Sequence, residues 1–208
     1  MLDITWFLTI SGRSHFLRKT PLLFWIRHAV LTSIPYGCYL GYAIGNKIPV
    51  QTFQHFRDTE DWRWRDSDKD YSVIAPNSTG KSKNVNLLIN VSGEIDIRYV
   101  SNDFPVYTIH ADEPGFDFLQ SWDQVTSFRK HYRKMFDQIR NDHGEEVIIH
   151  LFPATPNPIN FEIGKGIMKN IDPTVILNDK SNKSMNYGEV LTLHVSWLTP
   201  GYCSKIQQ

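Results

Sequence analysis

The sequence has few cysteines and no excess of either charge. Only two cysteines, Cys38 and Cys203, occur in 208 residues, and their separation matches no metal-binding spacing. We therefore expect free thiols in a reducing compartment and infer a cytoplasmic protein. Lys and Arg together number 22, as do Asp and Glu, so the formal net charge is zero. This balance argues against duplex DNA or RNA as a partner, because proteins that bind duplexes usually present a basic face.

Signatures of catalysis and metal binding are also lacking in the sequence. It contains no serine in a nucleophile-elbow pattern and no pair of histidines at metal-binding spacing on a helix. Residues 78–82 (Ser-Thr-Gly-Lys-Ser) end like a phosphate-binding loop but lack the first glycine of that motif. We therefore predict no catalytic residue, no metal site and no cofactor, and we favour recognition over chemistry.

One apolar segment, Leu22–Ile44, is long enough to test as a membrane span. Arg27 and His28 interrupt it, whereas a span has few or no charges between its ends. The chain also begins without the basic residues that open a signal peptide. These features favour a buried helix at about residues 21–45, with a membrane helix as the less favoured alternative.

Strand-like and helix-like patterns alternate along the chain. β-Branched and aromatic runs mark the strands, and apolar residues at helical spacing mark the helices. This alternation predicts an α/β fold with a mostly parallel sheet. A strand that ends in Ser-Gly occurs twice, at 11–12 and 92–93, which suggests two related halves joined within residues 76–83. We expect strands at 4–10, 50–56, 71–75, 85–91, 106–110, 146–152, 174–177 and 190–198, and helices at 21–45, 121–143 and 157–171.

The most informative segment is residues 146–158, where a buried strand runs directly into a helix. Pro153, Pro156 and Pro158 follow the strand, with Asn157 as the expected N-cap and Pro158 in the first helical turn. Such a joint directs free backbone N–H groups beyond the end of the strand, where α/β proteins bind phosphorylated ligands. The segment therefore predicts a phosphate-containing ligand.

Several other residues permit two interpretations. Trp62 and Trp64 either stack on nucleobases or pack over the sheet. His150 lies within an apolar strand, so we favour a core histidine with its hydrogen bonds satisfied over a site residue. For the basic run at residues 129–134 we favour a solvated helix face over a ligand site. For Gly164, inside the last expected helix, we favour close packing of that helix on a strand over direct contact with a ligand.

The segment His150–Pro156 and the nearby run Glu162–Lys165 together resemble the C-terminal signature of SAVED domains. These domains sense cyclic oligonucleotides in bacterial anti-phage systems, namely CBASS and type III CRISPR. A weaker similarity extends upstream through residues 85–93, so that the resemblance covers most of residues 20–178.

The resemblance implies two fused Rossmann-like, CARF-like halves with mostly parallel sheets, at residues 1–80 and 81–208. The first half would include the helix at about 21–45. SAVED domains bind one cyclic tri- or tetranucleotide in a pocket shared by the halves, and binding drives head-to-tail homo-oligomerisation that activates an effector. We find no effector segment in the sequence, so the resemblance implies an effector protein in trans, a small membrane effector formed by the N-terminal apolar segment, or a stand-alone component. Of these we expect an effector in trans.

The resemblance also assigns ligand-binding residues, loop by loop. The sequence departs from the family at Lys165, where arginine is expected, and at Asn160, where a small apolar residue is expected. Arg13, Lys81 and Lys83 are the cations that we expect to accompany helix N-termini in holding phosphates. One ligand-binding loop of the second half would consist of Pro153, Ala154, Thr155, Pro156 and Asn157. A companion loop of that half would consist of Ser92, Gly93 and Glu94. By topology, the equivalent loop of the first half would be Ser11, Gly12, Arg13 and Ser14.

Two alternatives to a sensor remain. Some CARF relatives cleave their cyclic ligand, and His110, Asp112 and Glu94 are the residues that would act in such a ring nuclease. A membrane-tethered SAVED effector would instead use the apolar segment Leu22–Ile44.

Overall fold

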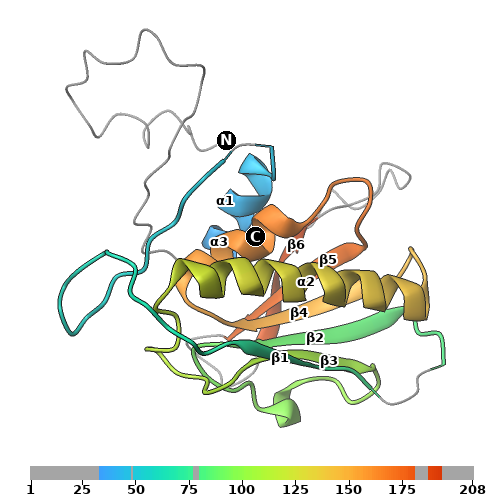
Figure 1. Cartoon of the computed structure of the whole chain (residues 1–208). Coiled ribbons are helices and arrows are strands. Elements are labelled where there is room, and N and C mark those ends of the chain that lie inside the picture. Colours follow the sequence, from blue (N-terminus) through green and yellow to red (C-terminus); the bar gives the residue numbers. More distant parts are fainter. Residues whose placement is uncertain (1–32, 48, 77–79, 181–186, 194–208) are drawn as a thin grey trace, which may run out of the picture.

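The computed structural model describes residues 33–47, 49–76, 80–180 and 187–193 (Figure 1). The predicted strand at 4–10, the first part of the predicted helix at 21–45 and Cys203 lie outside these residues. The elements are α1 (Ile34–Ile44), β1 (Tyr71–Ile74), β2 (Asn84–Asn90), η2 (Ile97–Tyr99), β3 (Val106–Ala111), α2 (Trp122–His143), β4 (Ile148–Ala154), α3 (Asn157–Gly166), β5 (Thr174–Lys180) and β6 (Tyr187–Leu193).

The strands form one mixed sheet in the order β1-β3-β2-β4-β5-β6. The four central strands are parallel, and β1 and β6 are antiparallel edges. This arrangement confirms the predicted α/β class with a mostly parallel sheet. β1 precedes residue 80 in the sequence and pairs with β3, and the division of the chain into two halves at residue 80 stays a prediction.

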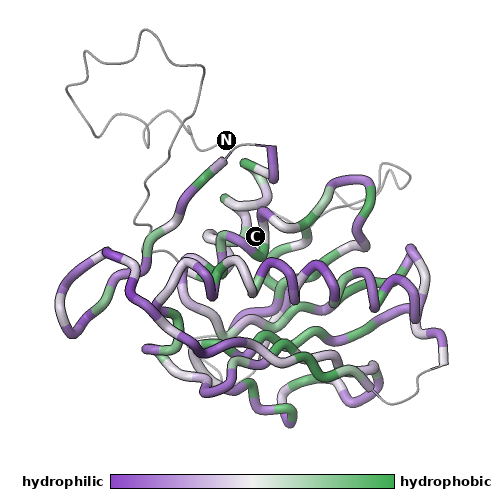
Figure 2. Tube along the Cα trace, viewed as in Figure 1, coloured by the Kyte–Doolittle hydropathy of each residue, from purple (hydrophilic) through white to green (hydrophobic). Residues whose placement is uncertain are grey.

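One face of the sheet carries the main hydrophobic core. α2 lies across this face, with α1 and α3 beside it (Figure 1). Alternate residues of the central strands point into the core, and Figure 2 shows the apolar segments concentrated in these strands. Leu88 of β2 points to the opposite face, where it packs with Ile95, Val100 and Phe152. The sheet therefore has a large core on one face and a small one on the other.

α2 begins and ends as the sequence predicts. Ser121 Oγ accepts a hydrogen bond from the Gln124 N–H, and the Gln124 side chain accepts one from the Ser121 N–H. These two bonds complete a capping box. Gly144 follows the helix with a φ of 100°, which favours glycine. The predicted helix at 121–143 is therefore confirmed.

α1 covers Ile34–Ile44, the described end of the helix predicted at 21–45. Gly45 ends it with a φ of 69°. Among the helices of the described ranges, none is long and apolar enough to cross a bilayer. The same residues contain no cluster of three or more side chains suited to hold a metal ion.

Two glycines allow α1 and α3 to pack with their backbones in contact. A Cβ atom on Gly41 would lie 2.0 Å from the carbonyl oxygen of Phe161, and one on Gly164 would lie 1.8 Å from that of Cys38. No side chain fits at such distances, so only glycine permits this approach. The prediction that Gly164 packs on a strand is wrong, because its partner is a second helix. Cys38 is a buried free thiol at this contact, and burial raises its pKa.

The basic run on α2 pairs with buried carboxylates. Arg129 donates two hydrogen bonds to Glu162, at 2.6 and 2.7 Å, and Arg133 donates two to Asp172, at 2.7 and 2.8 Å. Both carboxylates are buried, and they belong to α3 and the turn after it. The prediction of a solvated face is therefore wrong for these two arginines, which attach α2 to the α3 region.

The strand predicted at residues 50–56 is not formed. The segment is irregular. Its strand-like pairing with the described residues is a single isolated bridge between Phe56 and Asp61. Trp64 Nε1 donates to the Thr52 carbonyl at 3.2 Å, so a side chain satisfies backbone that a partner strand would otherwise satisfy. The alternation of apolar and polar residues at 50–56 therefore reflects which side chains of an irregular segment are buried.

α3 is shorter than the predicted helix at 157–171, because it ends at Gly166. Beyond that point Asp172 Oδ2 accepts a hydrogen bond from the Met168 N–H at 2.7 Å. Asn170 adopts a left-handed φ of 68°, which asparagine tolerates better than most residues. These two features fold residues 168–172 into a turn that the helical pattern did not reveal.

A buried histidine joins the far end of α2 to the sheet. His143 Nδ1 accepts a hydrogen bond from the Ser82 N–H at 3.0 Å, so the neutral ring carries its proton on Nε2. That nitrogen lies 2.8 Å from the Tyr107 hydroxyl, which in turn donates to Asp142 at 2.9 Å. Burial lowers the pKa of His143, and the nearby Asp142 charge opposes this only in part.

This arrangement predicts that the protein loses stability in mild acid. The folded-state pKa of His143 lies below its unfolded value of about 6.5, so the unfolded chain binds the proton more readily. The contribution is fully present above pH 6.5, is lost as the pH falls from 6.5 to the lowered pKa, and does not change further below that pKa. Half-buried His150, which contacts Asn84 and Phe104, acts in the same direction.

The measurement is the free energy of unfolding in urea between pH 7.5 and pH 5.5. We expect it to fall across this interval, and to fall less in His143→Asn, whose amide oxygen can replace Nδ1 but does not titrate. Equal slopes in the two proteins would contradict the assignment to His143.

Candidate functional site

The loops after β2 and β4 leave the sheet toward opposite faces. After β2 the chain turns to the face where Ile95 and Val100 pack, and after β4 it enters α3 on the face of the main core. β2 and β4 are neighbours at the centre of the sheet. This divergence opens a crevice beyond the carboxyl ends of the strands, which is where open α/β sheets bind ligands.

A cavity of about 670 Å³ occupies this crevice, a volume typical of sites for small molecules. Its walls come from the two diverging loops, the first turns of α1 and α3, an irregular segment before β1, the loop before α2 and the end of β5. The lining residues are Ser33, Ile34, Phe53, Gln54, His55, Phe56, Arg57, Trp62, Ser92, Gly93, Phe116, Asp117, Ala154, Thr155, Pro156, Asn157, Asn160, Asp179 and Lys180.

Two of the predicted loops meet in this cavity. Ser92 and Gly93 line it together with residues 154–157. The N–H groups of Val91 and Ser92 both donate to the Ala154 carbonyl, at 3.0 and 2.8 Å, and thereby join the two loops. The structure thus brings together residues that lie far apart in the sequence, and their ligand-binding role stays a prediction.

Other predicted residues do not line the cavity. Pro153 is buried within β4, and Glu94 is exposed in the loop after β2. The predicted first-half loop, residues 11–14, lies outside the described residues. Conversely, sequence reasoning missed Ser33, Ile34 and the whole segment 53–57, because no local pattern links them to the strand ends.

α3 begins at the cavity wall. Pro156 is its N-cap and Asn157 its first residue, so the predicted N-cap is wrong by one position. The first bond of the helix runs from the Asn160 N–H to the Pro156 carbonyl at 3.0 Å. The N–H groups of Asn157 and Ile159 precede this bond, Pro158 has none, and no side chain caps the helix. The helix end therefore offers backbone donors and a positive dipole to the cavity.

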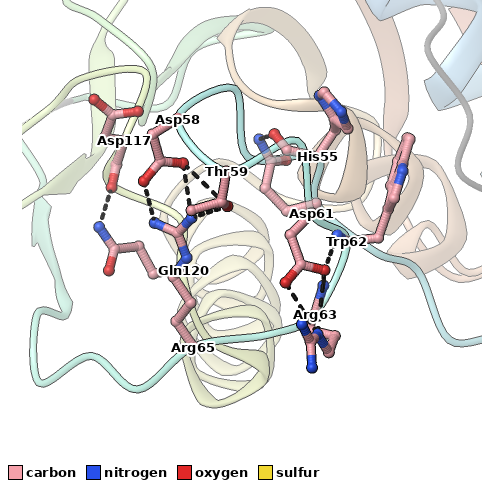
Figure 3. A network of polar contacts seen from close by, with 10 residues as sticks. His55, Asp58, Thr59, Asp61, Trp62, Arg63, Arg65, Asp117 and Gln120 are labelled. Carbon is pink, nitrogen blue, oxygen red and sulfur yellow. Dashed lines mark hydrogen bonds and ion pairs between the residues drawn. The ribbon is translucent and has the colours of Figure 1, made fainter.

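The irregular segment at residues 53–62 supplies another wall. Figure 3 shows the polar contacts that hold it, among them two hydrogen bonds from Arg65 to Asp58 at 2.7 and 2.9 Å. In the same view His55 and Trp62 lie side by side, with ring centroids 4.6 Å apart. Side-chain pairing thus fixes a loop without regular structure and presents two aromatic rings at the cavity.

The two tryptophans have different environments. Trp62 lines the cavity. Trp64 packs against the main core, with its ring centroid 5.9 Å from that of Trp122. Of the two interpretations that the sequence left open, packing is correct for Trp64, whereas Trp62 is placed where a nucleobase could stack.

Charges of both signs line the cavity. Arg57 and Lys180 are its cations, and Asp117 and Asp179 are its carboxylates. Arg57 lies 6.0 Å from the ring of Phe116, which is 78% exposed. The wall therefore combines aromatic surface with separate groups that suit anionic and hydrogen-donating parts of a ligand.

Lys81 and Lys83 are not near the cavity. They precede β2, whereas the cavity lies beyond the opposite, carboxyl ends of the strands. Their loop meets the other end of the sheet and is separate from this cavity, and their role in holding phosphates stays a prediction. The ring-nuclease candidates His110 and Asp112 also lie outside the lining, and Asp112 accepts a hydrogen bond from the Asp70 N–H at 2.8 Å.

The N-terminal turns of α1 and α3 both face the cavity, and the two helices contact each other reciprocally. Cys38 precedes Gly41 by the same interval as Phe161 precedes Gly164, and each glycine meets the carbonyl of that residue on the other helix. Such a pattern defines a local two-fold axis. Under this relation, Ser33 at the start of α1 corresponds to Pro156 at the start of α3.

An α/β sheet with a cavity at the diverging ends of its parallel strands is the arrangement of a Rossmann-like domain. The model of the SAVED family, the SMODS-associated and fused to various effectors sensor domain, matches residues 18–193. The chain belongs to this family. Comparison with curated protein sequences gives no match.

Solved structures share this fold. The Cap4 SAVED/CARF-domain containing receptor of Acinetobacter baumannii with the cyclic trinucleotide 2'3'3'-cAAA has a TM-score of 0.55 at 14% identity, over 78% of this chain and 37% of that one. The same receptor with 3'3'3'-cAAA has a TM-score of 0.55 at 15% identity, over 78% of this chain and 36% of that one. A further structure of this receptor has a TM-score of 0.57 at 12% identity, over 78% of this chain and 34% of that one. The chain thus spans about a third of the receptor's length.

Proposed function

We propose that this protein is a sensor that binds a cyclic tri- or tetranucleotide in anti-phage defence. The cavity carries the proposal, because it joins backbone donors at helix N-termini to aromatic rings and two cations. Phosphates would accept hydrogen bonds from the donors, and bases would stack on His55 and Trp62. Membership of the SAVED family and the cyclic trinucleotides bound by the similar receptor support this ligand class.

The proposal extends to assembly and location. Ligand binding would drive head-to-tail homo-oligomerisation in the cytoplasm and activate an effector protein in trans. A head-to-tail contact does not close on itself, so filaments follow from repeated addition. The ligand would act by bridging cavity walls that come from segments far apart in the chain. Two of these walls are the first turns of α1 and α3, and these helices contact each other at their glycines.

A ring nuclease gains no support from the described site. Cleavage needs a general base within hydrogen-bonding reach of the reacting hydroxyl. His110, Asp112 and Glu94 do not line the cavity. Chromatography of the cyclic ligand after incubation with the protein would reveal cleavage products if one of them acts.

The test of the sensor function is thermal unfolding with a panel of cyclic di-, tri- and tetranucleotides. A ligand at a hundred times its dissociation constant adds about 2.7 kcal/mol to the free energy of unfolding. This shifts the Tm of a chain of this size by about 5–10 °C. We expect such a shift with at least one cyclic tri- or tetranucleotide. No shift with any member would contradict the proposal.

Two variants locate the binding site. Trp62→Ala removes an aromatic ring from the cavity and should weaken binding about tenfold or more, because stacking contributes roughly 1–3 kcal/mol per base. Tyr39→Ala is the matched control, since this exposed aromatic residue of α1 does not line the cavity. Equal losses in both variants would place the ligand elsewhere.

A further inference from the structure

Asn160 places a buried amide in the first turn of α3. The residue lines the cavity although only 1% of it is exposed. The hydroxyl group of Thr155, which is also buried, donates a hydrogen bond to Asn160 Oδ1. This hydrogen bond orients the amide so that Nδ2 points away from Thr155. Among the described residues, Nδ2 has no hydrogen-bond partner.

A side-chain donor that has no acceptor among the described residues and belongs to a cavity wall is available to an acceptor of a ligand. Side chains of a helix lean toward its N-terminus, which brings the Asn160 amide over the end that faces the cavity. The unbonded N–H groups of Asn157 and Ile159 belong to the same end. Two backbone donors and one side-chain donor therefore serve a single position.

We infer that Asn160 determines where a phosphate of the ligand binds, by donating from Nδ2 to a phosphate oxygen at the N-terminus of α3. The inference rests on the proposed function, which names the class of ligand but not this residue. A phosphate oxygen is an acceptor with negative charge, so it suits all three donors and the helix dipole. An amino group of a base brings only donors and is rejected there. Thr155 is a positioning residue, because it holds the amide in this orientation.

The test measures binding of 3'3'3'-linked cyclic triadenylate to the full chain by calorimetry. Asn160→Asp keeps the size of the side chain and an oxygen for Thr155, but replaces the donor with a negative charge. We expect at least a 100-fold loss of affinity. Asn160→Leu removes the donor without adding charge, and we expect about a tenfold loss. Asn170→Asp adds the same charge on an exposed residue beyond the other end of α3 and should leave affinity unchanged.

Variants of Thr155 separate orientation from packing. Thr155→Ser keeps the hydroxyl and should bind as the original chain does. Thr155→Val loses it, frees the amide to rotate and should weaken binding several-fold. Thermal unfolding without ligand shows that each variant is folded. Equal affinities of the original chain and folded Asn160→Asp would overturn the inference.

The inference and the proposed function fail in distinguishable ways. If the original chain binds no cyclic oligonucleotide of the panel, the proposed function fails, and inorganic phosphate becomes the probe for Asn160. In nitrogen-15 NMR spectra the Asn160 side-chain amide signal is identified by its loss in Asn160→Leu. A saturable shift of this signal with phosphate supports the inference, and a signal that does not move overturns it.

Discussion

Gly164→Ala is expected to lower the free energy of unfolding by about 3 kcal/mol or more, or to prevent folding. The added Cβ would lie 1.8 Å from the Cys38 carbonyl oxygen, and both partners are helical backbone that no side-chain rotation can move aside. Because α1 would have to move away from α3, we also expect weaker ligand binding, since Ser33 and Ile34 at the start of α1 line the cavity. Urea unfolding and calorimetric titration measure the two effects.

Gly188→Ala is the matched control for this substitution. It lies in β6, where an added Cβ meets no atom within 4 Å, so its cost should stay below about 1 kcal/mol. Gly41→Ala should resemble Gly164→Ala, because its Cβ would lie 2.0 Å from the Phe161 carbonyl oxygen. The double variant should cost less than the sum, since the first substitution already separates the helices. Additive costs would contradict a single shared contact.

Asp172→Ala is expected to cost about 3 kcal/mol of unfolding free energy. The Asp172 side chain is fully buried, accepts two hydrogen bonds from Arg133 and accepts a third from the Met168 N–H. Its removal leaves a half-buried guanidinium without its main counter-charge and a backbone donor without its acceptor. Urea unfolding at pH 7 measures the loss.

Asp137→Ala tests the same arginine from its exposed side. Asp137 lies 3.1 Å from Arg133 on the next turn of α2, but its side chain is 53% exposed. An exposed ion pair of this kind contributes less than about 1 kcal/mol. If Asp137→Ala were as costly as Asp172→Ala, burial would not be what makes the Arg133–Asp172 pair important.

The parts of the fold that follow from short-range rules could be predicted from the sequence. The capping box at Ser121 and the glycine at position 144 set the ends of α2. The apolar run before Pro153 predicts β4, and the prolines after it predict the start of α3 within one residue. These predictions succeed because capping, turn chemistry and hydrophobic periodicity act between residues close together in the chain.

Several features of the site could not be predicted in this way. The segment 53–57 has no regular structure, and its place at the cavity depends on contacts such as that of Arg65 with Asp58 and of Trp64 with Thr52. The charge of Lys81 and Lys83 predicts a contact with phosphate, but the sheet places their loop at its other end, away from this cavity. Charge can be counted in a sequence, whereas the end of a sheet at which it lies depends on strand order.

By itself the sequence determined an α/β fold, a strand that runs directly into a helix and a resemblance to SAVED domains. These features are encoded locally, or as a family signature in residues 150–165. Only the tertiary structure decided which loops share a cavity, that α1 and α3 meet through two glycines, and that the Asn160 amide lies free at that cavity. The physical reason is that each depends on burial and contact between segments far apart in sequence, which no local pattern specifies.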